Sequence, residues 1–340
     1  MKATSDDSIS APGGKSSGAR GPSALCQLLG VSQPVIQGGM VWCTNAALVT
    51  AVGRAGGLGT LGSGSMYPEE LRAEIASVQE AFDGPFAVNV PLLYPAVEQH
   101  MQTIVDAGVP VVITSAGSPK KWTSFLKEHG VTVLHVVSSA VFAEKSQAAG
   151  VDAVIAEGFE AGGHNGREET TTLCLVPEVV AAVDVPVVAA GGISCGRSMM
   201  AAMALGAAGV QMGSRFVATQ ECPAHDKFKA HVLAAQAGAT KLRLKSVTPV
   251  RMLDNVSGGF SHLVAEAEAR SAGVEELREI LGKGRAKQGM RGGDLLDGEL
   301  EIGQVSARLH DIPSAGEVVR DVIAEFEQVR AALASPSFHW

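Results

Sequence analysis

Short runs of β-branched and small apolar residues recur along the chain from residue 34, and stretches of helical length separate them. The runs are PVIQ (34–37), GLGTL (57–61), PFAVNV (85–90), PVVITS (110–115), TVLHVV (132–137), DAVIAE (152–157), PVVAAG (186–191) and GVQMGS (209–214). Amphipathic segments such as EELRAEIASVQEAF lie between them, which is typical of parallel strands joined by right-handed helical crossovers. Eight such units predict an α/β protein with a (β/α)8 TIM barrel. An open doubly wound sheet is the alternative that the pattern leaves open.

The alternation stops after residue 236, where the composition changes. Residues 241–255 (KLRLKSVTPVRMLDN) are basic, a charged stretch of helical pattern follows, and residues 290–314 are rich in glycine. We therefore expect the barrel over 23–236, a small, mainly helical second domain over 237–312, and a C-terminal segment over 313–340 whose helix returns to the barrel. The first 22 residues are rich in Ser and Gly and are predicted to be a disordered tail.

Composition narrows the function classes. The 340 residues are 46% hydrophobic and 18% charged, as in an ordinary globular protein, and the net charge of −8 without a basic run argues against a nucleic-acid partner. No apolar run approaches the ~18 residues that a membrane span needs. The five cysteines form no CxxC pair and fit no zinc spacing, so we expect a reduced, cytoplasmic protein without a metal site.

Small and polar residues recur at the predicted strand ends, where a barrel places its active site. Gly191-Gly192 and Gly213-Ser214 end two neighbouring strands, and a predicted helix follows each pair. Glycine lets the backbone N–H groups approach an anion closely, and a helix N-terminus adds favourable dipole charge. These four residues therefore predict a phosphate-binding corner.

A ligand tethered by that phosphate would extend across the barrel mouth. Gly38, Gly39 and Met40 follow the first strand and offer backbone contacts and stacking room, while Asn89 offers an amide that donates and accepts. These properties suit a flavin with a tethered phosphate, which is the predicted ligand. Ordinary turns, strand-end capping by Asn89 and core packing of Met40 are the structural alternatives.

The candidate catalytic residue is His164, which follows Gly162-Gly163 in the loop after the sixth strand. An imidazole can accept a proton or hold an anionic oxygen at neutral pH. A solvated loop histidine is the alternative. His135 lies within a strand and is interpreted as a core residue, and Cys195, beside the phosphate corner, as a packed small residue and not a nucleophile.

The segments QGGMVW, PFAVNVPLL, EGFEAGGHNG, PVVAAGGI and VQMGSRF, in this order, resemble the nitronate monooxygenase (2-nitropropane dioxygenase) family of FMN barrel enzymes. That family includes the enoyl-acyl-carrier-protein reductase II branch. The resemblance implies noncovalent FMN, with Gly39 and Met40 at its ring, Asn89 and Glu157 at the ring or ribityl chain, and Gly162 and Gly163 beside the ring. It implies that Gly191, Gly192, Gly213 and Ser214 hold the phosphate and that His164 is catalytic.

Two reactions of the family fit these residues. In the first, His164 helps to generate or bind an alkyl nitronate, which FMN and O2 then oxidise. In the alternative, NAD(P)H-dependent reduction of an enoyl thioester, His164 steadies the developing enolate oxygen. EAGGHNGREETTT resembles the reductase branch more closely, yet no residues identify a nicotinamide site or a docking surface for an acyl carrier protein. Nitronate oxidation needs neither, so the sequence favours it narrowly.

Other classes fit less well. An enzyme of the IMP dehydrogenase type needs a cysteine in the loop that here carries His164. A flavin carrier without turnover would keep the phosphate corner and have no use for the histidine. The expected partner is a small-molecule substrate, and a homodimer is left open.

Overall fold

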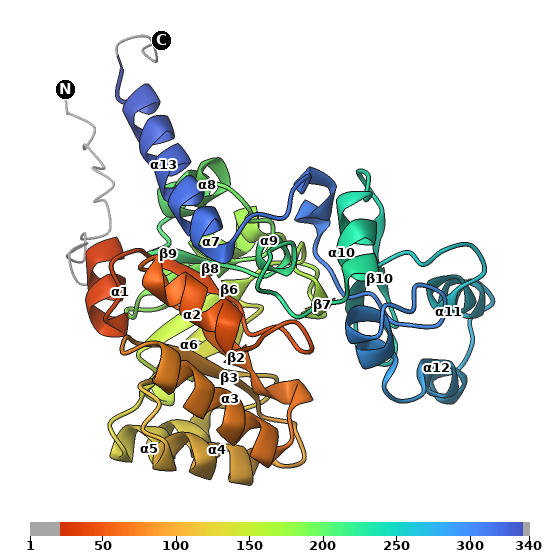
Figure 1. The fold of residues 1–340 in the computed structure, drawn as a ribbon, viewed down its shortest axis with the longest axis horizontal. Helices are drawn as coiled ribbons and strands as arrows, with labels where there is room; N and C mark the ends of the chain where they lie inside the picture. Colours follow the sequence, from red (N-terminus) through yellow and green to blue (C-terminus); the bar gives the residue numbers. More distant parts are fainter. Residues whose placement is uncertain (1–20, 336–340) are drawn as a thin grey trace, which may run out of the picture.

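The computed structural model describes residues 21–335 and shows a barrel of parallel strands surrounded by helices (Figure 1). Every predicted strand forms: β1 (Val35–Gln37), β2 (Thr60–Gly62), β3 (Ala87–Pro91), β4 (Val111–Ser115), β5 (Thr132–Val137), β6 (Ala153–Glu157), β8 (Val187–Ala190) and β9 (Gly209–Met212). Their order is β1-β9-β8-β6-β5-β4-β3-β2 with parallel pairing throughout, and a bridge between Ile36 and Leu58 closes the ring. The predicted (β/α)8 barrel is confirmed. Residues 1–20 of the predicted tail, and residues 336–340, lie outside the described residues.

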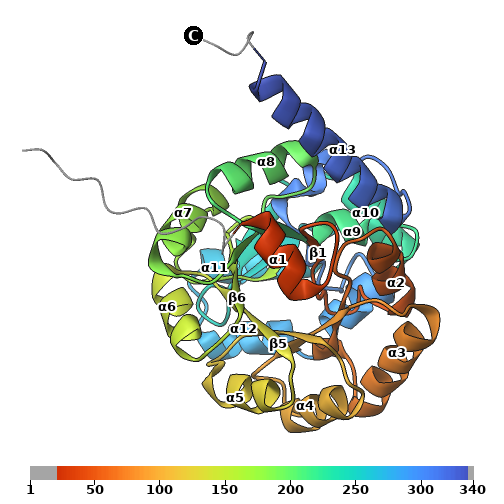
Figure 2. The same ribbon diagram turned by 90° about the vertical axis from the view of Figure 1, so that its left-hand side faces the viewer.

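An outer layer of helices surrounds the strands (Figure 2). It consists of α2 (Ala46–Arg54), α3 (Pro68–Ala81), α4 (Val97–Asp106), α5 (Lys120–Glu128), α6 (Ala140–Ala148), α7 (Thr172–Ala182) and α8 (Gly196–Ala204). The strands are apolar on both faces because one face lines the barrel interior and the other packs under this layer. Ile36, Ile113 and Ile155 are fully or almost fully buried in the interior, whereas Val88 and Val154 are buried under the helices.

The N-terminal end of the barrel is closed by α1 (Pro22–Leu29), which lies across it in Figure 2. Leu25 and Leu29 of this helix belong to the same buried cluster as the interior strand residues. A Cβ on Gly209 would lie 2.5 Å from Leu25 Cδ2, so the helix packs directly on the strand ends. With this end closed, the opposite end of the barrel is the one available to a ligand.

The chain after the barrel forms a side unit next to the C-terminal strand ends (Figure 1). It contains α10 (Asp226–Leu233), α11 (Phe260–Ala269), α12 (Val274–Leu281), a π-helical turn (Lys287–Arg291) and a 3-10 helix (Gln304–Arg308). The basic segment forms an antiparallel hairpin of β10 (Thr240–Arg243) and β11 (Val250–Leu253), which the sequence pattern did not predict. The short strand β7 (Gly163–His164), from the loop after β6, pairs with β11 and joins this unit to the barrel.

The last helix, α13 (Ala315–Leu333), packs against α2 and α8 on the outside of the barrel. It begins with a capping box in which Ser314 and Glu317 satisfy each other's backbone N–H groups. Gly196 permits the contact, because a Cβ there would lie 2.2 Å from the backbone nitrogen of Phe326. In the described part of the chain, α13 and the other helices lack the length and apolar character needed to cross a membrane.

Candidate active site

A cavity of about 1150 Å³ opens at the C-terminal ends of the barrel strands. Its floor is formed by strand ends and its far wall by the side unit, which contributes Thr248, Met290 and residues 301, 302 and 305. The predicted site residues come from the ends of five barrel strands, and the structure brings all of them to this cavity: Gly38, Gly39, Met40, Asn89, Glu157, Gly162, Gly163, His164, Gly191, Gly192, Gly213 and Ser214.

One corner of the cavity is built from backbone amides. Gly191 and Gly192 have φ values of 85° and 72°, a conformation that favours glycine, and Gly213 precedes the short helix α9 (Ser214–Val217). Among residues 21–335, the N–H groups of Gly191, Gly192, Gly213 and Ser214 have no hydrogen-bond acceptor. The hydroxyl of Ser214 accepts from the Gly303 N–H at 2.9 Å, which leaves its own hydrogen to donate. This corner can therefore donate several hydrogen bonds to an anion.

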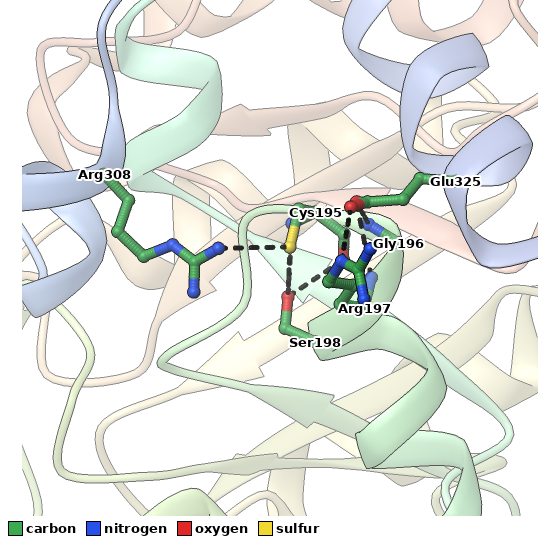
Figure 3. Close-up of polar contacts among 6 residues, drawn as sticks. All are labelled: Cys195, Gly196, Arg197, Ser198, Arg308 and Glu325. Atoms are coloured by element: carbon green, nitrogen blue, oxygen red, sulfur yellow. Dashed lines mark hydrogen bonds and ion pairs between the residues drawn. The ribbon is translucent and has the colours of Figure 1, made fainter. Parts of the chain in front are cut away.

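The N-terminus of α8, close behind Gly192 in the sequence, is already occupied by protein groups (Figure 3). The Glu325 carboxylate of α13 accepts from the N–H groups of Gly196 at 2.7 Å and Arg197 at 3.4 Å. Cys195 lies next to Ser198, with 3.6 Å between Sγ and Oγ, and does not line the cavity. Of the two predicted helix starts, only that of α9 therefore leaves its backbone N–H groups available to an anion, and the anion site stays a prediction.

The strand ends that line the cavity also offer side-chain acceptors without donors. A Cβ on Gly39 would lie 2.3 Å from Asn89 Cβ, so this glycine lets the first loop settle directly on β3. Asn89 donates through Nδ2 to the carbonyl of Ile113 at 3.1 Å, and its Oδ1 has no donor among the described residues. Gln211 also lines the cavity, and its buried Oε1 has no partner in that part of the chain. A ligand with N–H or O–H groups would satisfy these oxygens.

His164 is held by the side unit rather than by the barrel alone. It pairs with Val250 of β11, and Gly163 pairs with Arg251. Arg251 is 2% exposed and donates through Nε to the carbonyl of Phe159 at 3.0 Å, which ties β11 to the loop that carries the histidine. The imidazole itself is exposed on the cavity wall. It is thus free to meet a ligand in the cavity.

Three carboxyl groups in and behind the cavity have raised pKa values because burial disfavours their charged forms. Burial raises the pKa of Glu157, at the end of β6, to about 7. It also raises the pKa of Glu301 to about 7, and that of Glu299 to about 8 with a contribution from Glu301. A further carboxyl group on the cavity wall, Glu160, accepts hydrogen bonds from the backbone N–H of Thr172 at 2.9 Å and from its hydroxyl at 3.0 Å, which fixes the loop after β6.

His135 lines the cavity from β5 and is 4% exposed. Its Nδ1 lies 2.7 Å from the hydroxyl of Thr114, and burial lowers the pKa of the imidazole to about 4. It is therefore a neutral, hydrogen-bonded core histidine with one edge on the cavity. The described residues contain no cluster of His, Cys, Asp and Glu that could hold a metal ion.

Residues 22–100 and 94–325 match the family model described as nitronate monooxygenase. The chain belongs to the nitronate monooxygenase family. It is 32% identical to a (3aS,4S,5R,7aS)-5-hydroxy-7a-methyl-1-oxo-octahydro-1H-indene-4-carboxyl-CoA dehydrogenase of Mycobacterium tuberculosis, over 88% of this chain and 95% of the relative. It is 34% identical to a probable nitronate monooxygenase of Staphylococcus saprophyticus, over 70% of this chain and 79% of the relative.

Solved structures agree with this membership. FabK from Thermotoga maritima superimposes with a TM-score of 0.86 at 38% identity, covering 91% of this chain and 97% of its own. A nitroalkane oxidase from Streptomyces ansochromogenes gives a TM-score of 0.79 at 29% identity, covering 92% and 100%. The predicted family is confirmed, and the chain is an oxidoreductase of the nitronate monooxygenase family.

For this nitronate monooxygenase family member, sequence reasoning missed the cavity residues that lie outside strand-end motifs. Glu301 follows a charged and glycine-rich stretch whose pattern gives no sign of a cavity position. Gln211 lies within a strand, and only its unpaired Oε1 distinguishes it from a structural residue. The alternation of charged and apolar residues in ELEIG was the one signal that a short extended segment lies there.

Proposed function

We propose that this chain is an FMN-dependent oxidoreductase that reduces the carbon–carbon double bond of an enoyl thioester, with NAD(P)H as electron donor. The observation that carries the proposal is the size and lining of the cavity. Away from the phosphate corner, the 1150 Å³ cavity is also lined by Leu93, Tyr94 and Phe142. We call this part of the cavity the apolar arm. Leu93 is 80% exposed and Phe142 46% exposed, so this arm presents apolar surface to a ligand. A flavin and a small nitronate would leave the arm unused, whereas an acyl chain on a thioester would occupy it.

The residues fit FMN. The unpaired amides of Gly191, Gly192, Gly213 and Ser214 suit a phosphate, and the free oxygens of Asn89 and Gln211 suit the donors of a flavin ring or ribityl chain. Gly213 has an ordinary φ of −106°, and a Cβ there would contact only Met40, at 3.6 Å and beyond. The fold itself therefore does not require glycine at this position, whereas a phosphate approaching the backbone would.

FMN, when bound, supplies the hydride acceptor and donor that the amino acids of the chain lack. The residues of the chain bind and orient the substrate around it. His164 extends from β7 into the cavity, where its N–H can hold the thioester oxygen as negative charge develops on it. The side unit closes one wall of the site and keeps the imidazole on that wall through β11.

The thioester class is also supported by the Mycobacterium tuberculosis relative, whose name gives a carboxyl-CoA substrate. Nitronate oxidation is the second candidate, because the staphylococcal relative is named a probable nitronate monooxygenase and this reaction needs only a flavin, one imidazole and O2. Both candidates use the same phosphate corner and His164, so they differ in substrate and electron donor.

An anaerobic flavin-absorbance assay separates the two reactions, because reduction bleaches the flavin and reoxidation by a substrate restores its colour. Purified protein loaded with FMN is mixed in turn with NADH, NADPH and propionate-3-nitronate, and the flavin absorbance is followed. We expect bleaching by one reduced nicotinamide and recolouring on addition of crotonyl-CoA or octenoyl-CoA, with octenoyl-CoA giving the lower KM because it fills the apolar arm. Bleaching by the nitronate, with no response to either nicotinamide, would establish the second candidate instead.

A further inference from the structure

We propose that Glu301 is the acid that protonates the substrate α-carbon, an assignment that rests on the proposed enoyl thioester reduction. The reaction adds a hydride at the β-carbon and a proton at the α-carbon. The N–H of His164 is proposed to hydrogen-bond to the thioester oxygen. The proton for the α-carbon therefore comes from a second group on the same wall of the cavity. Glu301 is the carboxyl group that the side unit places there.

The position of Glu301 is set by two backbone features. The residue forms an antiparallel bridge with Met252 of β11, the strand that also pairs with His164. Its Oε2 lies 2.6 Å from the point that a Cβ on Gly163 would occupy, so the carboxyl group fills the space left open by the residue next to His164. Gly163 has a φ of 76°, which also favours glycine there. The imidazole and the carboxyl group therefore come from adjacent positions on one wall.

Among the described residues, no side chain or backbone group forms a hydrogen bond or ion pair with the Glu301 carboxyl group, although the group lines the cavity. Glu299 is 6% exposed and likewise has no partner in that part of the chain. Arg285, whose charge acts on Glu299, donates its hydrogen bonds to the carbonyls of Ile280, Leu281 and Asp297 and not to either carboxyl group. Such surroundings favour the acid form of a carboxyl group, which can then give its proton to a ligand.

The electrostatic surroundings agree with this assignment. Burial raises the pKa of Glu301 to about 7, so a large fraction of the group carries a proton at neutral pH. The charged or titratable groups that interact with it are Glu299 on its own segment and Cys43 from the loop after β1. Around these two, His164 from β7 and Arg285 act on Glu299, and Arg291 acts on Cys43. The hydrogen bond with Cys222, together with burial, raises the pKa of the Cys43 thiol well above its usual value, so this neighbour stays neutral.

The proton transfer balances without another reactant. After the β-carbon has received its hydride, the electron pair of the enolate forms the new Cα–H bond with the proton of Glu301. The O–H bond of Glu301 breaks, the thioester C=O is restored, and the oxygen leaves its contact with His164. The Glu301 carboxylate then takes a proton from water at the open cavity mouth, which returns the site to its starting state.

The decisive variant is Glu301→Gln, which keeps the shape of the side chain and removes the acid. FMN content and the bleaching rate with NAD(P)H should stay within about twofold of the parent, because neither step uses this proton. Recolouring by crotonyl-CoA should slow by about 10²-fold, the usual contribution of a positioned acid. In the parent, the rate of recolouring should fall as pH rises through about 7, because Glu301 loses its acid form. The variant should lack this alkaline limb of the pH–rate profile.

Two further measurements separate Glu301 from its neighbours. Glu275→Gln, on the exposed face of α12 where the side chain is 81% exposed, is the control and should behave as the parent. In D2O the parent should deliver deuterium to one face of the α-carbon, and Glu301→Gln should lose that preference because water then supplies the proton. An alkaline limb that survives in Glu301→Gln, or that disappears only in Glu299→Gln, would overturn the assignment.

Failure of the proposed reaction would be visible separately. If the parent is not recoloured by any enoyl thioester, the substrate proposal fails whatever Glu301 does. The protonation of Glu301 has its own readout, the carboxylic acid carbonyl band in infrared difference spectra of the flavin-loaded protein around pH 7. We expect this band to lose intensity in Glu301→Gln. If the parent recolours but this band is unchanged by the substitution, Glu301 is ionised and cannot be the acid.

Discussion

At the scale of single residues, Gly213 gives the sharpest test of the phosphate corner. Because the fold tolerates a side chain at its φ and leaves space beside it, Gly213→Val should lower FMN affinity by at least about tenfold, or ~1.4 kcal/mol. The free energy of unfolding of the flavin-free protein should change by less than ~1 kcal/mol. Gly273→Val, at a helix start with nothing within 4 Å of the new Cβ, is the matched control. Equal FMN dissociation constants for the two variants would refute the assignment.

The same residues show how far the sequence could predict the site. Glycine pairs at strand ends and His164 after a double glycine are local patterns, and the structure brings all of these residues to one cavity. The sequence alone did not show why each of these positions needs a glycine. Gly39 and Gly162 allow close contacts with Asn89 and with the backbone of Ile302, which depend on segments far away in the sequence. Glu301 could not be predicted for the same reason, because only the bridge to Met252 places it beside His164.

At the scale of elements, the contact between α8 and α13 depends on Glu325. This carboxylate accepts from the first N–H groups of α8 and also meets Arg197 at 3.2 Å (Figure 3). Glu325→Ala should reduce the free energy of unfolding by about 1–2 kcal/mol, as loss of a helix cap does. Arg197→Ala removes only an ion pair whose arginine is 72% exposed and should cost less than ~1 kcal/mol. Urea unfolding of both variants tests this, and equal losses would mean that the ion pair and not the cap matters.

The barrel strands were predictable because each is a continuous apolar run, buried on both faces, that needs no knowledge of its neighbours. The three-stranded sheet β10-β11-β7 has no such signal. β7 is two residues long and forms through its pairing with β11, and β10 carries Lys241 and Arg243 on a partly exposed surface. Sequence periodicity therefore identified the barrel that supports the site but not the sheet that holds its histidine.

At the scale of the whole molecule, one end of the barrel contributes buried core and the opposite end contains the cavity. Leu25 of α1 is fully buried in the interior cluster at the closed end, while the cavity lies at the other end. Leu25→Ala should therefore lower the free energy of unfolding by about 2–5 kcal/mol, as deletion of a buried leucine side chain does. At temperatures where the variant is folded, its FMN dissociation constant and its KM for an enoyl thioester should equal those of the parent, and the exposed Gln27→Ala serves as control. A change in FMN affinity without a change in stability would mean that the two ends of the barrel are coupled, because the interior side chains would then transmit the loss at Leu25 to the phosphate corner.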